Sequence, residues 1–138
     1  MIAAALAAIF CVLSLLHIGW ALGVRGGKVQ VLPERGGAPL FQPGPLSTLA
    51  VAAVLFLAAL IVTQRAGLGR ELLPPALVAP GCWGVSVALV LRAFGEFRYV
   101  GFFKRVRDTA FARMDTLLYS PLALLLGAGA GYVAFAAS

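Results

Sequence analysis

The sequence predicts an all-α integral membrane protein: a four-helix bundle with one interfacial amphipathic helix between its third and fourth helices. Of its 138 residues, 62% are hydrophobic and only 12% are charged, and the mean hydropathy is +0.98. Soluble domains carry about 25% charged residues. The apolar residues also form four long runs, and a bilayer core needs about 20 apolar residues per helix. We therefore treat residues 1–138 as a single transmembrane domain.

The four apolar runs cover residues 2–22, 46–63, 72–94 and 117–136. They are continuous rather than alternating, which excludes the strands of a membrane barrel, and unpaired backbone groups are costly in lipid, which favours helices. The first run resembles a secretory signal, but it is longer than the apolar core of such signals and no basic residue precedes Arg25. We expect it to be a helix of the mature protein. Pro80 should kink the third helix.

Basic residues are distributed unequally over the three connections, and this predicts the topology. The second connection holds only Arg65 and Arg70, whereas the first and third together hold eight basic residues: Arg25, Lys28, Arg35, Arg98, Lys104, Arg105, Arg107 and Arg113. The positive-inside rule places the first and third connections in the cytoplasm and both termini outside. The net charge of +6 then reflects orientation and contact with anionic lipid headgroups, and we expect no nucleic-acid partner.

The two basic connections have different patterns. Residues 23–45 are rich in Gly and Pro, which excludes a helix and leaves either a plain surface loop or a lid over the membrane face. Residues 102–114 place apolar side chains at steps of three or four, with most of the charged ones opposite. This spacing predicts an amphipathic helix lying in the membrane interface.

Ionisable and aromatic residues gather toward the predicted cytoplasmic ends of the helices. Ionisable groups at membrane depth are costly, which makes them candidates for function. The catalytic candidates are His17, Glu96 and Asp115, and the ligand or headgroup-binding candidates are Trp20, Arg92, Arg98, Lys104, Arg105 and Tyr119. Helical spacing allows Arg92 to pair with Glu96, and Asp115 with Tyr119. The alternative is that these residues only anchor the helices at the interface.

Small residues and cysteines indicate packing rather than chemistry. Gly127 and Gly131 have the GxxxG spacing that lets helices approach closely, either within the bundle or in a dimer. Cys11 and Cys82 fall at similar depths, but two cysteines make no metal motif, and we expect them to act as small apolar residues. The sequence has no nucleotide-binding or paired-histidine motif, so we expect neither a metal nor a cofactor.

Several segments resemble a family of small bacterial membrane proteins known as domain of unknown function 3995. They are His17 to Gly23, Leu91 to Arg98, Gly101 to Arg105, Asp115-Thr116 and Tyr119 to Pro121. The resemblance covers nearly the whole chain and implies four helices in a bacterial inner membrane. It implies no activity.

Three functions remain open. The first is a non-enzymatic membrane component that binds lipid headgroups or a partner membrane protein at its cytoplasmic face, as a homo-oligomer or within a larger complex. The second is a membrane-embedded enzyme acting on a lipid or quinone-like substrate through His17, Glu96, Arg92 and Asp115. The third is a small transporter, for which Pro80 is the main hint.

Overall fold

A computed structural model describes residues 1–24, 32–35, 38–40 and 43–137. Four of its helices are long and apolar enough to cross a membrane, which confirms the all-helical class. They are α1 (Ile2–Ala21), α2 (Pro45–Arg65), α3 (Pro75–Phe94) and the helix Ala110–Ala136, which comprises α4 (Ala110–Met114), the π-helix η2 (Asp115–Tyr119) and α5 (Ser120–Ala136). Strands β1 (Glu34–Arg35) and β2 (Ala38–Pro39) pair antiparallel between α1 and α2. Much of the predicted first loop lies outside the described residues.

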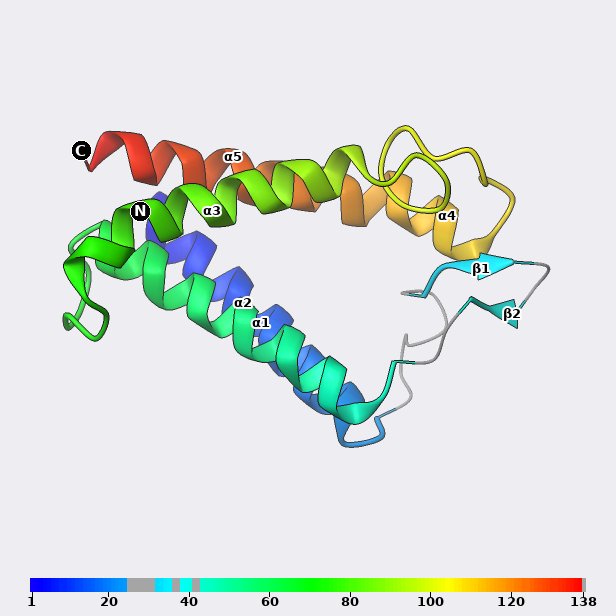
Figure 1. Ribbon diagram of the computed structural model, residues 1–138, viewed down its shortest axis with the longest axis horizontal. Helices are drawn as coiled ribbons and strands as arrows, with labels where there is room; N and C mark the ends of the chain where they lie inside the picture. The colour runs from blue at the N-terminus through cyan, green and yellow to red at the C-terminus, as the bar shows by residue number, and fades with distance from the viewer. Residues whose placement is uncertain (25–31, 36–37, 41–42, 138) are drawn as a thin grey trace.

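The helices form two pairs, α1 with α2 and α3 with α5 (Figure 1). The pairs approach each other near the two termini and the α2–α3 connection, which we call the terminal end. They diverge toward the other end, where the α3–α4 connection and the strands β1 and β2 lie (Figure 1). We call this the basic end, because Arg98, Lys104, Arg105 and Arg107 belong to the α3–α4 segment there and Arg113 belongs to α4.

Small residues bring the helices of each pair into contact. A Cβ atom added at Gly127 would lie 3.0 Å from the carbonyl oxygen of Ser86, and one at Gly131 would lie 2.8 Å from Ser86 Oγ. That hydroxyl donates to the carbonyl of Gly127 at 2.7 Å. Gly127 and Gly131 therefore lie on the face of α5 that packs against α3. In the other pair, Ser14 Oγ of α1 donates to the Ala52 carbonyl of α2 at 2.8 Å.

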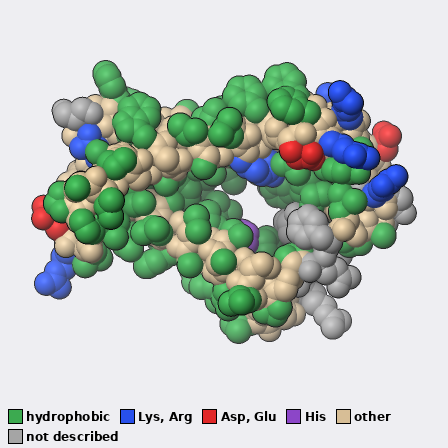
Figure 2. All heavy atoms as spheres, viewed as in Figure 1, with side chains coloured by type: hydrophobic (Ala, Val, Ile, Leu, Met, Phe, Trp, Pro, Cys, Tyr) green, Lys and Arg blue, Asp and Glu red, His purple; other side chains and the backbone are tan. Residues whose placement is uncertain are grey.

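Side chains on the outside of the helices are mostly large and apolar (Figure 2). Leu15, Leu117, Leu125 and Phe135 are all more exposed than buried. A water-soluble protein of this size rarely exposes so continuous an apolar surface, whereas lipid chains solvate it without cost. The exposed surface thus matches a multi-pass membrane protein.

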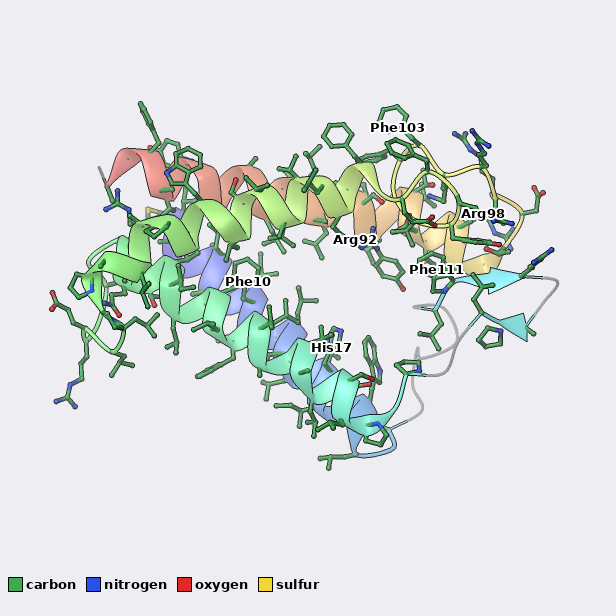
Figure 3. All side chains as sticks on the ribbon, viewed as in Figure 1. Phe10, His17, Arg92, Arg98, Phe103 and Phe111 are labelled. Atoms are coloured by element: carbon green, nitrogen blue, oxygen red, sulfur yellow. The ribbon has the colours of Figure 1, made fainter. Side chains whose placement is uncertain are left out.

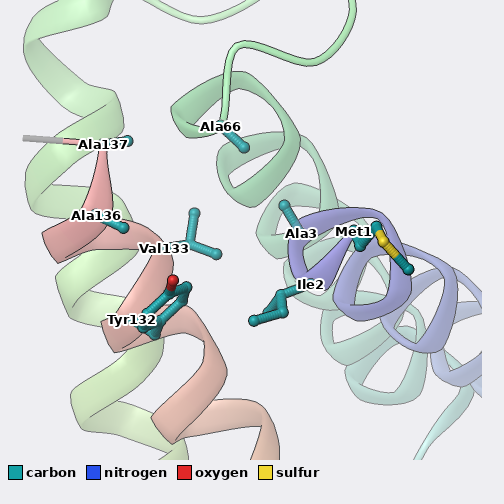
Figure 4. A pocket seen from close by; sticks show the side chains of 8 residues that line it. All are labelled: Met1, Ile2, Ala3, Ala66, Tyr132, Val133, Ala136 and Ala137. Carbon is teal, nitrogen blue, oxygen red and sulfur yellow. The ribbon is translucent and has the colours of Figure 1, made fainter.

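At the terminal end, Gln64 holds the α2–α3 connection, and Arg65 Nη2 donates to the Ala134 carbonyl of α5 at 2.8 Å. Gln64 Oε1 accepts hydrogen bonds from the backbone N–H groups of Leu72 and Leu73, and its Nε2 donates to the Leu73 carbonyl at 2.6 Å. The same end has a hollow of about 500 Å³ between α1 and α5 (Figure 4). Tyr132 carries the only polar side chain among its lining residues, and the others are apolar.

The amphipathic helix predicted over residues 102–114 is largely wrong. Only Ala110–Met114 is helical, and residues 95–109 form a chain of turns. Before the predicted helix, Gly95 and Gly101 have φ angles of 82° and 89° and turn the chain back, so that the N–H of Phe102 donates to the Ala93 carbonyl at 2.9 Å. The segment folds back on the end of α3 because its backbone and Lys104 are drawn to a buried carboxylate, described below.

The last helix begins at Ala110 rather than near residue 117, and its first turns are irregular. In η2 the N–H of Ser120 donates to the carbonyl of Asp115, five residues back instead of four. Pro121 follows directly; it has no N–H and its ring crowds the carbonyl four residues earlier. A proline at this place accounts for the widened turn. Pro80, by contrast, lies inside α3, which continues through it.

Candidate functional site: a polar cleft between the helix pairs

A cleft of about 320 Å³ lies between the two helix pairs, toward the basic end. Figure 2 shows it as a hollow between the pairs. Its apolar walls come from α1, α3 and α5, and four polar or aromatic side chains line it as well: His17, Trp20, Arg92 and Tyr119. Figure 3 shows His17 on α1 and Arg92 on α3 directed into the space between the pairs.

Arg92 is held by Asp115 on the neighbouring helix. Its Nη2 donates to Asp115 Oδ1 at 2.8 Å, and the two residues are 23 positions apart in the sequence. The π-helical turn begins at Asp115 and ends at Tyr119. Its geometry therefore determines how the Asp115 carboxylate, which binds Arg92, is positioned relative to the Tyr119 phenol, which lines the cleft. Turns of this kind are frequent at functional sites.

The other oxygen of Asp115 binds the α3–α4 segment. Oδ2 accepts from the N–H of Gly101 at 2.8 Å and from Lys104 Nζ at 3.0 Å. The Lys104 ammonium also donates to the Gly101 carbonyl at 3.0 Å and to Thr116 Oγ1 at 2.6 Å. An ammonium has three donors, and all three are therefore used. The side chains of Asp115 and Lys104 are 0% and 1% exposed.

The three charges of this cluster do not cancel. Arg92 and Lys104 contribute two positive charges and Asp115 one negative charge, which leaves one excess positive charge. Lys104 is enclosed, whereas the Arg92 side chain is 36% exposed and lines the cleft. Its Nη1 atom is buried and has no hydrogen-bond partner among the described residues. The excess charge therefore faces the cleft through Arg92.

His17 is oriented by its own helix. Its Nδ1 lies 2.7 Å from the Leu13 carbonyl oxygen, and because a carbonyl only accepts, Nδ1 carries a proton. The ring also meets Trp20 edge-on, with centroids 4.9 Å apart. The side chain is thus fixed from two sides, and its second ring nitrogen remains available to a ligand.

The structure brings together four of the residues selected from the sequence and separates the others. His17, Trp20, Arg92 and Tyr119 line one cleft, with Asp115 directly behind Arg92. Lys104, expected at headgroup level, is instead buried. Arg98 and Arg105 are exposed outside the cleft, and Arg98 lies over the Tyr99 ring at 5.2 Å.

The pairing of Arg92 with Glu96 that helical spacing allows does not form, and Arg92 binds Asp115 instead. Helix α3 ends at Phe94, so Glu96 is no longer on the same helical face, and its carboxylate accepts from the N–H of Tyr99 instead. No hydrogen bond joins Asp115 to Tyr119 among the described residues; Tyr119 packs near the Phe111 ring, with centroids 6.1 Å apart. The acid–base cluster of the enzyme hypothesis is therefore only partly assembled, because Glu96 lies outside it.

Sequence reasoning missed the walls of the cleft and the role of Lys104. Leu13, Leu89, Leu122 and Leu126 face inward between the pairs, but each is an ordinary residue of an apolar run. One signal for Lys104 was present: Asp115 is a lone carboxylate at the start of an apolar helix, and such a group requires cationic partners. Cys11 and Cys82 are free thiols, and the described residues hold no group of three potential metal ligands.

Comparison with known families supports the resemblance. The model of a family described as protein of unknown function DUF3995 matches residues 10–130. The chain belongs to this family. In this DUF3995 protein, all the residues that line the cleft or form the Arg92–Asp115–Lys104 cluster fall within the matched range. No curated protein and no solved structure matches the chain.

Proposed function

We propose that this DUF3995 protein is a non-enzymatic membrane component that binds an anionic amphiphile, a lipid headgroup with its chain, in the cleft between its helix pairs. The observation that carries the proposal is the excess positive charge of the Arg92–Asp115–Lys104 cluster, which reaches the cleft through Arg92. A charge at membrane depth is costly unless an opposite charge neutralises it. An anionic group beside Arg92 would do so.

The shape and lining of the cleft support an amphiphile rather than a small ion. Polar contacts are available at the end near Arg92 and His17, whereas Leu89, Leu122 and Leu126 supply apolar wall. Binding sites for organic ligands have this composition, with a few placed polar groups in an apolar pocket, and a volume of about 300 Å³ or more is typical. Guanidinium groups bind carboxylate and phosphate through charge-assisted hydrogen bonds, and Arg92 lines the cleft with a side chain that is 36% exposed.

The basic end supports a cytoplasmic orientation and an interfacial position for residues 95–109. Exposed rings of Phe94 and Phe103 stack with centroids 5.8 Å apart, and Phe97 lies 6.4 Å from Phe103. Exposed Arg98 and Arg105 follow in the same segment. Aromatic rings and basic side chains are enriched at membrane surfaces, with the basic ones on the cytoplasmic side. We therefore place this segment, although it is not a helix, at the inner interface of the bacterial inner membrane, with both termini outside.

The experiment measures lipid binding by the fluorescence of Trp20. The chain has two tryptophans, and Trp83 lies 47% exposed on α3 away from the cleft lining. Substitution Trp83→Phe leaves Trp20 as the reporter. The purified protein is placed in bilayers that contain brominated phosphatidylglycerol or brominated phosphatidylcholine. We expect brominated phosphatidylglycerol to quench Trp20 at a mole fraction about tenfold lower than brominated phosphatidylcholine does, because only the anionic lipid gains a net charge-assisted interaction with the cluster.

Two variants identify the site. Arg92→Gln should abolish the preference for the anionic lipid, whereas Arg98→Gln, which removes an exposed arginine outside the cleft, should leave it unchanged. Because Arg92→Gln also disturbs Asp115, a third variant, Leu13→Phe, narrows the cleft without altering the charged cluster. It should weaken quenching by both lipids. Equal quenching by both lipids in the Trp83→Phe protein would refute the proposal.

A further inference from the structure

We infer that the cleft selects a monoanionic headgroup that carries a hydroxyl donor beside its charged group, which His17 Nε2 accepts while Arg92 binds the anion. The inference rests on the proposed function, since it specifies the ligand of the same cleft. Two independent features define it: the charge of the buried cluster and the orientation of one imidazole.

The charge of the cluster favours one negative charge. Arg92, Asp115 and Lys104 sum to one positive charge, and Lys104 and Asp115 are both enclosed and fully hydrogen-bonded. A phosphodiester or a carboxylate neutralises this sum. A doubly charged phosphate monoester would leave a negative charge at membrane depth, which is costly.

The histidine supplies an acceptor. Because Nδ1–H donates to the Leu13 carbonyl, a neutral His17 ring presents Nε2 as an unprotonated acceptor. Nε2 has no hydrogen-bond partner within the described part of the chain, and the side chain lines the cleft. The other charged or titratable side chains at the cleft are Arg92 of α3 and Tyr119 of η2, with Asp115 behind Arg92.

Arg92 and His17 have complementary demands. A guanidinium only donates, so it binds the anionic oxygens, whereas Nε2 of neutral imidazole only accepts, so it requires a donor. These groups come from α3 and α1, on opposite helix pairs (Figure 3). A headgroup that combines a phosphodiester with a free hydroxyl satisfies both and bridges the two pairs. A headgroup with the same charge but no hydroxyl satisfies only Arg92.

The test compares two lipids of equal charge in the Trp83→Phe protein. Phosphatidylglycerol and phosphatidylethanol are both monoanionic phosphodiesters, but only the first has free hydroxyls. With brominated acyl chains on each, we expect phosphatidylglycerol to quench Trp20 at a mole fraction about fivefold lower, the effect of one hydrogen bond. Brominated phosphatidic acid at a pH where it is doubly charged should bind more weakly than phosphatidylglycerol.

Variants at position 17 assign the preference to the imidazole. His17→Phe keeps a ring against Trp20 but removes the acceptor, so both phosphodiesters should quench alike. His17→Gln places an amide oxygen near the former Nε2 and should restore part of the preference. Deacylated glycerophosphoglycerol added in solution should not compete, if the ligand is a membrane lipid; competition would identify a soluble phosphodiester as the source.

The outcomes separate this inference from the proposed function. Equal quenching by the two phosphodiesters in the Trp83→Phe protein would overturn the hydroxyl selection, while dependence on Arg92 would still support anion binding. A preference that persists in His17→Phe would overturn the role of His17. Loss of all anion preference with Arg92 intact would refute both.

Discussion

The ammonium nitrogen of Lys104 lies 3.0 Å from Asp115 Oδ2, and neither side chain reaches the surface. This contact joins an irregular segment to the start of the last helix. Arg92 completes the connection from α3, so one carboxylate fixes three parts of the chain at the basic end. The geometry of the cleft depends on this carboxylate, although Asp115 itself does not line the cleft.

Asp115→Asn should destabilise the protein strongly. It leaves Lys104 and Arg92 without a counter-charge, and breaking a buried ion pair costs about 3–5 kcal/mol. Unfolding in detergent, followed by circular dichroism, measures the change. Glu96→Gln is the matched control, because Glu96 is an exposed carboxylate of the same segment that only accepts from a backbone N–H. Similar midpoints for both variants would contradict the role given to Asp115.

Gly101→Ala should prevent the α3–α4 segment from folding back on α3. Gly101 has a φ angle of 89°, and an added Cβ would lie 2.3 Å from the Phe94 carbonyl oxygen. Gly23→Ala is the matched control for backbone strain, because φ at Gly23 is also positive, at 97°, but no atom lies within 4 Å of the added Cβ. Backbone strain alone costs about 1 kcal/mol. We expect Gly101→Ala to lose at least about 2 kcal/mol more than Gly23→Ala in the same unfolding assay.

Gly127→Ala should loosen the contact between α3 and α5. The added methyl would lie 2.9 Å from Val90 Cγ2 and 3.0 Å from the Ser86 carbonyl oxygen, and overpacking of this kind costs about 1–3 kcal/mol. At Gly84, on α3, an added Cβ meets nothing within 4 Å. Gly84→Ala should be neutral or slightly stabilising because glycine is a poor helix former. If both variants unfolded alike, the close approach at Gly127 would not matter for stability.

The orientation can be measured with single cysteines. In a protein carrying Cys11→Ala and Cys82→Ala, we expect Leu68→Cys to react with a membrane-impermeant maleimide in right-side-out vesicles. Leu68 is 43% exposed in the α2–α3 connection. Arg105→Cys, at the basic end, should react only after the vesicles are permeabilised. The reverse pattern would place the basic end outside and contradict the positive-inside assignment.

The four helices could be predicted because each is a continuous apolar run, a property that the sequence displays locally. The last helix was predicted to end at residue 136, as it does, but its start was not predicted: Thr109 caps the helix at Ala110, and the irregular turn that follows is tied by Asp115 to residues 11 and 23 positions away. The amphipathic spacing of residues 102–114 predicted a helix that does not form over most of that range. The spacing assumes that Lys104 faces solvent, whereas a buried carboxylate from outside that pattern draws it inward.

The cleft could be predicted only in part. His17, Arg92 and Tyr119 stood out because polar residues are rare in apolar helices. Successive membrane-spanning helices run in opposite directions, and this predicted that the three residues lie near the same end of the bundle. Which charges pair could not be read from helical spacing, since α3 ends before Glu96 and leaves Arg92 to Asp115. The leucines that form the walls carry no distinguishing signal.

The divergence of the helix pairs has a consequence for the surrounding bilayer as well. A molecule whose pairs meet at the terminal end and separate toward the basic end (Figure 1) occupies more area in one leaflet than in the other. Lipids beside it must compensate for this unequal cross-section, either by entering the wider half or by tilting around it. The protein is therefore a wedge, and its distribution in a curved membrane should follow the sign of the curvature.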